Sequence, residues 1–258
     1  MTKPFLLRRT KDMVAKDLPE RVEQVHYCDM STQQERLYYS TAGMLKRTLF
    51  GEKEEGGGGA EKLQVLSALQ RLRQIAIHPG LVDEELSQSG KYDLMKDLMH
   101  EAIAEGDKVL IFSQFVKHLA IIRRDLKSLG INFAYLDGSM NSQKRAEEVA
   151  RFQEDNNVKV FLISLKAGGV GLNLTAARYV FMLDPWWNPA IEQQAINRAH
   201  RIGQKQTVFV YKFITRESIE EKILKLQERK MAVAGEVVQS EESFFKSLSK
   251  DDLMSLFE

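Results

Sequence analysis

Two arginines, Arg198 and Arg201, lie three residues apart in the stretch 184–204, which reads DPWWNPAIEQQAINRAHRIGQ. A guanidinium is planar and permanently charged, and it offers paired N–H donors to phosphoryl oxygens as their negative charge grows during transfer. Residues three apart on a helix point in similar directions, so this spacing predicts two guanidiniums directed at one anion. The alternative interpretation is a pair of solvated charges on a helix surface, where most arginines lie.

Clear helix signals surround the two arginines. Asn188 is a good N-cap, Pro189 suits the first helical position, and Gly203 suits the residue after the helix end. We therefore expect a helix from Pro189 to Ile202, with Gln194 on the same edge as the arginines. Four apolar residues at helical spacing are expected to dock this helix: Ile191, Ala195, Ala199 and Ile202.

The sequence of this helix resembles the last helicase motif of the Swi/Snf family of double-stranded-DNA translocases, a branch of the superfamily-two helicases. The signature of that motif is QAxxRxHRIGQ, and its eight fixed positions are matched by Gln194, Ala195, Arg198, His200, Arg201, Ile202, Gly203 and Gln204. The resemblance implies that Arg198 and Arg201 are arginine fingers acting on the γ-phosphate of ATP, and that Gln194 is a third catalytic residue.

A glycine-rich stretch, SLKAGGVGLNLT at residues 164–175, is a second candidate for phosphate binding. A strand followed by glycines and then a helix start directs backbone amides at an anion, and Lys166 adds a point charge. Many family members have threonine and arginine where Leu165 and Lys166 stand, and a lysine gives a phosphate a point charge instead of a paired contact. By resemblance, the residues against the DNA backbone are Ser164, Lys166, Gly168 and Gly169, and those nearer the nucleotide are Gly171 and Asn173.

Two shorter motifs follow other expected strands: FSQF at residues 112–115, and LDGSM at residues 136–140 with Arg145 beyond it. Small polar residues in a turn leave backbone N–H groups and a hydroxyl for a phosphate oxygen. In the family, the first motif lies near DNA or the interface between lobes, and the second contacts one DNA strand. The alternative is two plain turns with a capping serine, which would leave Arg145 unexplained. The DNA-binding residues implied here are Ser113, Gln114, Gly138, Ser139 and Arg145.

Trp186 and Trp187 are adjacent in the turn before the arginine helix. Two indoles are costly to leave in water, so we expect one in the core and the other against DNA or an opposing lobe. Trp187, with Asn188 beside it, is the candidate for coupling DNA contact to the nucleotide.

Apolar strands separated by helical stretches must position these motifs. Strands are expected at residues 22–30, 109–112, 133–136, 158–164, 179–183 and 208–214. The helices between them predict an α/β fold, a RecA-like lobe with a mostly parallel sheet covered by helices on both faces. Ligands bind such sheets beyond the carboxyl ends of the strands, where each motif falls.

Four regions are expected along the chain. They are a linker and leading strand at 1–30, a helical appendage at 31–90, the RecA-like lobe at 91–231, and a bracing segment at 232–258. Residues 4–23, PFLLRRTKDMVAKDLPERVE, resemble the linker that precedes the second lobe in the family. In the appendage, a capping box of Ser31 and Gln34 opens one helix, a second helix spans about 60–78, and a flexible loop, EKEEGGGG, lies at 52–59.

Composition limits the other possibilities. The 258 residues carry a net charge of +1, so any binding of nucleic acid must come from a local patch. The single cysteine, Cys28, excludes an intramolecular disulfide and a multi-cysteine metal site, and no apolar run approaches the roughly 18 residues of a membrane span. We expect an intracellular protein, in the cytoplasm or nucleoid of a prokaryote or the nucleus of a eukaryote, with no metal ligands of its own.

The sequence lacks half of a phosphoryl-transfer site. It has no Walker-type phosphate loop and no Asp-Glu-x-His motif to hold Mg²⁺ and position water. The resemblance therefore implies the second motor lobe of a DNA-dependent ATPase, which closes on a first lobe that holds ATP and Mg²⁺, grips double-stranded DNA and acts on a DNA-bound protein. Alone, it should not hydrolyse ATP. Two other interpretations stay open: a RecA-like module that binds DNA or protein without nucleotide, and a lobe of a strand-separating DNA or RNA helicase.

Overall fold

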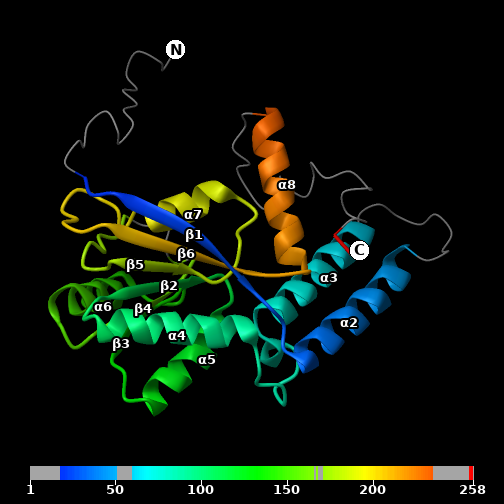
Figure 1. Ribbon diagram of the computed structural model, residues 1–258, viewed down its shortest axis with the longest axis horizontal. Helices are drawn as coiled ribbons and strands as arrows, with labels where there is room; N and C mark the ends of the chain where they lie inside the picture. Colours follow the sequence, from blue (N-terminus) through cyan, green and yellow to red (C-terminus); the bar gives the residue numbers. More distant parts are fainter. Residues whose placement is uncertain (1–17, 51–59, 166, 168–170, 235–255, 258) are drawn as a thin grey trace.

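The computed structural model describes residues 18–50, 60–165, 167, 171–234 and 256–257. Its described part contains one sheet of six strands in the order β1-β6-β5-β2-β4-β3, and every neighbouring pair is parallel (Figure 1). The strands are β1 Arg21–Cys28, β2 Val109–Ser113, β3 Phe133–Leu136, β4 Val160–Ser164, β5 Tyr179–Met182 and β6 Val208–Thr215. Every expected strand is confirmed, with small differences at the ends.

The two strands β2 and β4 show why this sheet forms. They read VLIFS and VFLIS, and all of their residues are buried. Continuous apolar runs are typical of parallel strands covered on both faces, because alternate side chains then enter two separate cores. Val109 and Ile111 face one layer of helices, and Leu110 and Phe112 face the other.

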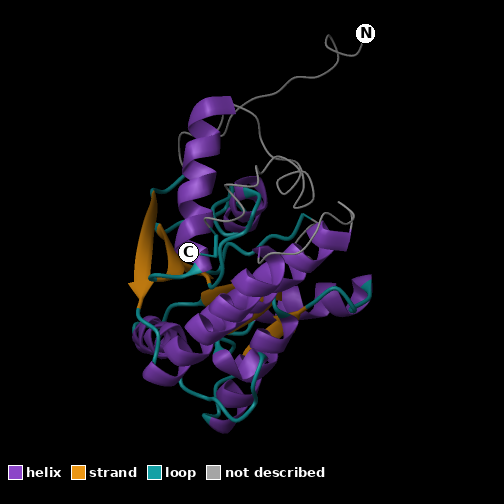
Figure 2. Cartoon of the chain, turned by 90° about the vertical axis from the view of Figure 1, so that its right-hand side faces the viewer, coloured by secondary structure: helices purple, strands orange, loops and turns teal. Residues whose placement is uncertain are grey.

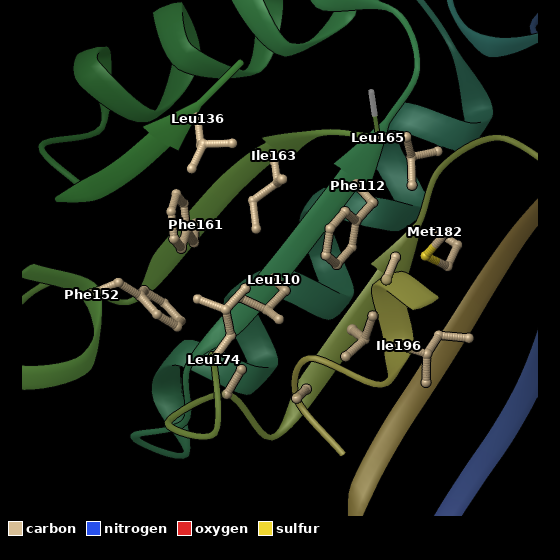
Figure 3. Packing of buried hydrophobic residues seen from close by; sticks show 14 of the residues in the cluster. Leu110, Phe112, Leu136, Phe152, Phe161, Ile163, Leu165, Leu174, Met182 and Ile196 are labelled. Carbon is tan, nitrogen blue, oxygen red and sulfur yellow. The ribbon is translucent and has the colours of Figure 1, made fainter. Parts of the chain in front are cut away.

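Helices cover both faces of the sheet, as Figure 2 shows around the orange strands. α4 (Gly90–Ala104) and α5 (Val116–Ser128) pack on one face. α6 (Ser142–Glu154) and α7 (Pro189–Ile196) contribute Phe152 and Ile196 to the core on the other face, which Figure 3 shows. The expected α/β lobe is therefore present.

A pair of helices, α2 (Thr32–Phe50) and α3 (Ala60–Ile77), lies between β1 and α4 in the chain and is followed by a short 3-10 helix, η2 (Pro79–Leu81). The capping box is confirmed, because the Gln34 N–H donates to Ser31 Oγ at 3.2 Å and the Ser31 N–H donates to Gln34 Oε1 at 3.3 Å. α3 packs against α2 and against α8 (Ile219–Ala234), and Leu256 and Phe257 join the same core. The expected loop at 52–59 and residues 235–255 of the expected bracing segment lie outside the described residues.

The helix that begins at Pro189 is shorter than its sequence predicts. Its start is confirmed, because Asn188 Oδ1 accepts the N–H of Ala190 at 2.9 Å. Its end lies at Ile196 instead of Ile202, and turns follow. Ile202, expected in the docking stripe, is 77% exposed, so that expectation was wrong.

Hydrogen bonds to other parts of the chain explain the early end. The Arg198 carbonyl accepts from the Leu174 N–H at 3.0 Å, and the Ala199 carbonyl accepts from Gln204 Nε2 at 3.3 Å. These carbonyls bind partners outside the helix instead of extending it. Gly203 has a φ of 105°, a left-handed conformation that suits glycine, and it terminates the turns. We call residues 197–204 the arginine segment.

Candidate functional site

The motif residues gather at one edge of the sheet. Because the described strands are all parallel, their carboxyl ends lie at the same edge. Ser113 and Ser164 are paired in register at the ends of β2 and β4. Asp137 follows β3 directly, and Asp184 follows the end of β5 closely. The loops after these four strands therefore meet at this edge.

Asp184 joins the loop after β5 to the loop after β2. Its buried carboxylate accepts hydrogen bonds from the Ser113 hydroxyl at 2.8 Å and from the Gln114 N–H at 3.1 Å. Burial raises the pKa of Asp184 to about 6, although the charge of Arg73 and these two bonds favour the carboxylate. The Ser113 oxygen also accepts the Phe115 N–H at 3.1 Å, which fixes the turn.

Ser113 and Ser164, expected on the DNA backbone, are buried. In this conformation both side chains lie inside the molecule. Ser113 shapes its loop through Asp184, much as the plain-turn alternative expects, although the N-cap of α5 is Phe115 and lacks a side-chain hydrogen bond. Gln114, half-buried, is more accessible than Ser113.

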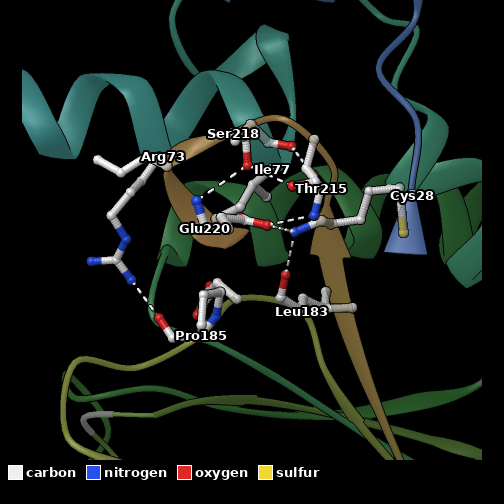
Figure 4. A network of polar contacts seen from close by, with 12 residues as sticks. Cys28, Arg73, Ile77, Leu183, Pro185, Thr215, Ser218 and Glu220 are labelled. Carbon is white, nitrogen blue, oxygen red and sulfur yellow. Dashed lines mark hydrogen bonds and ion pairs between the residues drawn. The ribbon is translucent and has the colours of Figure 1, made fainter. Parts of the chain in front are cut away.

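Two helices hold the connection between β5 and α7 by its carbonyl groups, as Figure 4 shows. Arg73 of α3 donates from Nη2 to the Pro185 carbonyl at 2.7 Å. Lys91 of α4 donates from Nζ to the Leu183 carbonyl at 3.0 Å, and it forms a fully buried ion pair with Glu220 of α8. The backbone on both sides of Asp184 is therefore fixed before α7 begins.

Both tryptophans of this connection are buried, so the expectation of an exposed indole was wrong. Trp187 is 1% exposed and lies in the core shared by α2, α3 and α8, with the Arg73 guanidinium 5.1 Å from its ring. The backbone of Trp186 is held too, because its carbonyl accepts from Gln227 and its N–H donates to Glu192 Oε1 at 2.7 Å. If Trp187 couples DNA contact to the nucleotide, it must do so through its packing in this core.

The roles of Arg73, Lys91 and Asp184 were not predicted from the sequence. One feature of the sequence could have indicated these residues: a charged residue beside apolar ones, such as Arg73 next to Leu72 in a helix that packs in a core. A charge in such a place must have a partner, so it marks a fixed contact.

The arginine segment carries one buried and one exposed guanidinium. Arg198 is 7% exposed, whereas Arg201 is exposed. Burial lowers the pKa of Arg198, and the charge of Arg201 lowers it further. Both side chains remain cations, so an anion bound between them would offset their repulsion. Gln194, on α7, is also exposed.

Hydrogen bonds join the arginine segment to the end of the glycine-rich stretch. The Leu174 N–H donates to the Arg198 carbonyl at 3.0 Å. Gln204 Nε2 donates to the carbonyls of Thr175 at 3.1 Å and Ala177 at 2.9 Å. Gln204 matches the motif signature but was given no role from sequence, and the structure makes it the link between two motifs.

Gly171 and Asn173 are exposed and come directly before these contacts in the chain. The stretch expected near the nucleotide is thereby held to the arginine segment. Lys166, Gly168 and Gly169, expected on DNA, lie outside the described residues.

Arg145 links the loop after β3 to the glycine-rich stretch. Its Nε donates to the Met140 carbonyl at 3.0 Å, and its Nη2 donates to the Asp137 carbonyl at 3.4 Å. Its Nη1 makes a longer contact of 3.5 Å with the Ala167 carbonyl. Two of the motifs expected on DNA are therefore joined by one guanidinium.

Gly138 and Ser139 lie exposed in the turn after β3. The hydroxyl and the N–H of Ser139 both donate to Asp137 Oδ1, at 2.6 and 2.9 Å. The serine closes the turn, but the N-cap of α6 is Asn141, whose Oδ1 accepts the Lys144 N–H at 2.9 Å.

Comparisons with known proteins agree with this geometry. Residues 90–203 match the family model described as helicase conserved C-terminal domain, and residues 1–81 match that described as SNF2-related domain. The solved SWI2/SNF2 ATPase C-terminal domain of Sulfolobus solfataricus has a TM-score of 0.76 and 32% sequence identity, over 93% of this chain and 99% of that chain. This chain belongs to the Swi2/Snf2 family. It has the fold of the RecA-like C-terminal helicase domains of that family.

Two further similar proteins are longer than this chain, which matches only part of each. The putative ATP-dependent helicase/translocase YwqA of Bacillus subtilis is 39% identical over 266 residues, which cover 100% of this chain and 28% of that protein. The Sulfolobus solfataricus SWI2/SNF2 ATPase core in complex with dsDNA has a TM-score of 0.78 and 33% identity, over 99% of this chain and 54% of that chain. The Swi2/Snf2 chain spans about a quarter of the length of the curated bacterial relatives it matches.

Proposed function

We propose that this chain is the second motor lobe of an ATP-dependent double-stranded-DNA translocase, and that Arg198 and Arg201 act on the γ-phosphate of ATP held by a first lobe. The observation that carries the proposal is the pair of guanidiniums, one buried and one exposed, close enough for the charge of Arg201 to lower the pKa of Arg198. A phosphoryl group between them brings negative charge to two cations that otherwise repel each other.

ATP and Mg²⁺ are held mainly by the first lobe in this proposal. The groups that the structure describes around the arginine segment suit the phosphates: guanidiniums, the amide of Gln194, and the exposed Gly171 and Asn173. Mg²⁺ prefers carboxylate oxygens, but the nearby motif carboxylate of Asp184 is buried and already accepts from Ser113 and Gln114. In this proposal the chain orients the nucleotide, and the first lobe holds the metal.

Duplex DNA is proposed to bind along the loops after β2, β3 and β4. Gln114, Gly138 and Ser139 are its accessible members, and Arg145 ties the loops together. Lys166 completes the set of residues proposed to contact DNA. The SWI2/SNF2 ATPase core that was solved in complex with dsDNA resembles nearly this whole chain, which supports a role in binding duplex DNA. Opening and closing of the two lobes would then move the protein along the duplex without separating its strands.

The partners in this proposal are duplex DNA, the first lobe of the same parent protein, and a DNA-bound protein that the motor displaces or remodels. A membrane is not among them. Among residues 18–50, 60–165 and 171–234, no helix is long and apolar enough to cross a bilayer.

Replacing Arg198 or Arg201 with alanine in a parent protein that contains both lobes tests the proposal. Loss of either finger should lower DNA-stimulated ATP turnover about a thousand-fold or more, because the developing charge on the γ-phosphate loses its partner. The Kd for duplex DNA should change less than about two-fold, since DNA lies on other loops. Steady-state turnover and fluorescence anisotropy measure the two quantities.

Arg124→Ala is the matched control, because this arginine of α5 is highly exposed and, within the described part of the chain, forms an ion pair with its neighbour Asp125. It should leave both quantities unchanged. An equal loss of turnover and DNA affinity in the Arg198 variant would contradict the finger assignment. Unchanged turnover would favour a module that binds DNA without using nucleotide.

A further inference from the structure

The backbone leading into β1 is bonded to the arginine segment. His200 Nε2 lies 2.7 Å from the carbonyl oxygen of Pro19, a residue 181 positions earlier in the chain. A carbonyl can only accept, so Nε2 carries the proton and His200 is the donor. His200 stands between Arg198 and Arg201 in sequence, so this contact ties the finger pair to Pro19.

Two further contacts hold the same short segment. Arg21 Nη1 donates to Gln193 Oε1 on α7 at 3.2 Å. The Glu20 carbonyl accepts the N–H of Val208, the first residue of β6, at 3.0 Å. Residues 19–21 are thus hydrogen-bonded to residues that lie before and after Arg198 in the sequence. We call the contacts of Pro19 and Arg21 with His200 and Gln193 the linker clasp.

We propose that the linker clasp couples the position of the chain leading into β1 to the position of the arginine fingers, with His200 as the positioning residue. The proposal rests on the function proposed above and on the resemblance of residues 4–23 to the linker that precedes the second lobe. Movement of the first lobe then displaces the Pro19 carbonyl, and His200 transmits the displacement to Arg198 and Arg201. The fingers are aligned when the lobes are closed, and the two hydrogen bonds of the linker clasp maintain that alignment.

Three substitutions in the two-lobe parent test the coupling. His200→Ala removes the donor. His200→Gln keeps an N–H near the position of Nε2, so it should restore the contact. Gln193→Met removes the Arg21 contact independently, which keeps the test decisive if the His200→Ala variant folds poorly. His100→Ala, at an exposed site on α4, is the matched control.

We expect His200→Ala to lower the DNA-stimulated kcat on the order of ten-fold, because misplaced fingers stabilise the transition state less. The KM for ATP and the Kd for duplex DNA should change less than about two-fold, and the unfolding midpoint of the variant should stay near that of the parent. Gln193→Met should act in the same direction but more weakly, and His200→Gln should recover most of the kcat.

A kcat for His200→Ala within about two-fold of the parent, while Arg198→Ala abolishes turnover, would overturn the coupling and leave the fingers in place. Failure of His200→Gln to recover kcat in a stably folded protein would also overturn it. If Arg198→Ala itself leaves turnover unchanged, the proposed function fails first, so the two failures are distinguishable.

Discussion

Arg198 is held in a costly position by the protein around it. Its guanidinium is removed from water and placed near a second cation, and both conditions lower its pKa. In the proposed function, a phosphoryl group bound between the two guanidiniums would offset their mutual repulsion.

His118 provides a test of acid stability at the same scale. It is fully buried on α5, and neither ring nitrogen has a hydrogen-bond partner within the described residues. Burial holds its pKa well below 6.5, and the neighbouring His78 and Lys91 lower it further. Below about pH 6.5, His118 is protonated in the unfolded chain but stays neutral in the folded one. Its contribution to the free energy of unfolding is therefore full above that pH and falls as the pH drops.

His118→Leu should therefore reduce the acid dependence of the free energy of unfolding, by up to about 1.4 kcal/mol per pH unit below pH 6.5. Urea unfolding of this chain from pH 7 to pH 5 measures the effect. His100→Leu, at an exposed position, should keep the parental slope. If the free energy of unfolding depended on pH in the same way for the parent and for His118→Leu, His118 would be protonated freely in the folded protein.

Side chains that act through local pattern could be predicted, and those that act through distant partners could not. The capping box of Ser31 and Gln34 follows from a spacing of three residues, and it is present. The bond between Asp184 and Ser113 joins residues 71 positions apart, and no periodicity relates them. Sequence therefore placed Ser113 in a loop at the end of a strand, but neither its burial nor its bond to Asp184 could be predicted.

At the scale of elements, Gln204 determines how the arginine segment meets the glycine-rich stretch. Its buried amide donates to three carbonyls, those of Thr175, Ala177 and Ala199. Gln204→Ala leaves these acceptors without that donor, which should lower the free energy of unfolding by about 1–3 kcal/mol. In the two-lobe parent it should also lower ATP turnover, because the finger backbone loses its link to the loop of Gly171.

Chemical denaturation and turnover assays measure both effects of Gln204→Ala. Gln206→Ala is the control, since this side chain is exposed two residues away. Loss of stability without loss of turnover would mean that Gln204 supports the fold and not the alignment of the fingers.

The strands were predictable as elements because their apolar runs are short and bounded, and β2 and β4 are buried along their whole length. The end of α7 was not predictable. Residues 197–202 retain a helical pattern, but Leu174 and Gln204 take the carbonyls of Arg198 and Ala199. Tertiary hydrogen bonds outweighed local propensity, and they converted the finger helix into a set of turns.

For the whole molecule, the proposal divides one active site between two lobes. We expect the 258-residue chain alone to show no ATP hydrolysis above background, with or without duplex DNA, because the sequence has no Walker-type loop to hold the phosphates. A parent protein with both lobes should hydrolyse ATP, and faster with duplex DNA. A coupled-enzyme assay on the two proteins side by side makes the comparison.

Measurable turnover by the single chain that disappears in Arg198→Ala would contradict the divided site. If both proteins are silent with every duplex tested, the chain does not work as part of a motor. Denaturation curves recorded on the same samples exclude misfolding as the cause of silence.

The pairing of β1 with β6 has a consequence for synthesis. Arg21 pairs with Val208, roughly 190 residues later, so at about 5–20 residues per second a ribosome needs roughly 10–40 s to supply the partner strand. During that time Arg21–Cys28 cannot take its place in the sheet. The partner strand β6 follows the arginine segment in the chain, and Pro19 next to β1 contacts His200 of that segment. The nascent chain can therefore complete its sheet only after the arginine segment has been synthesised.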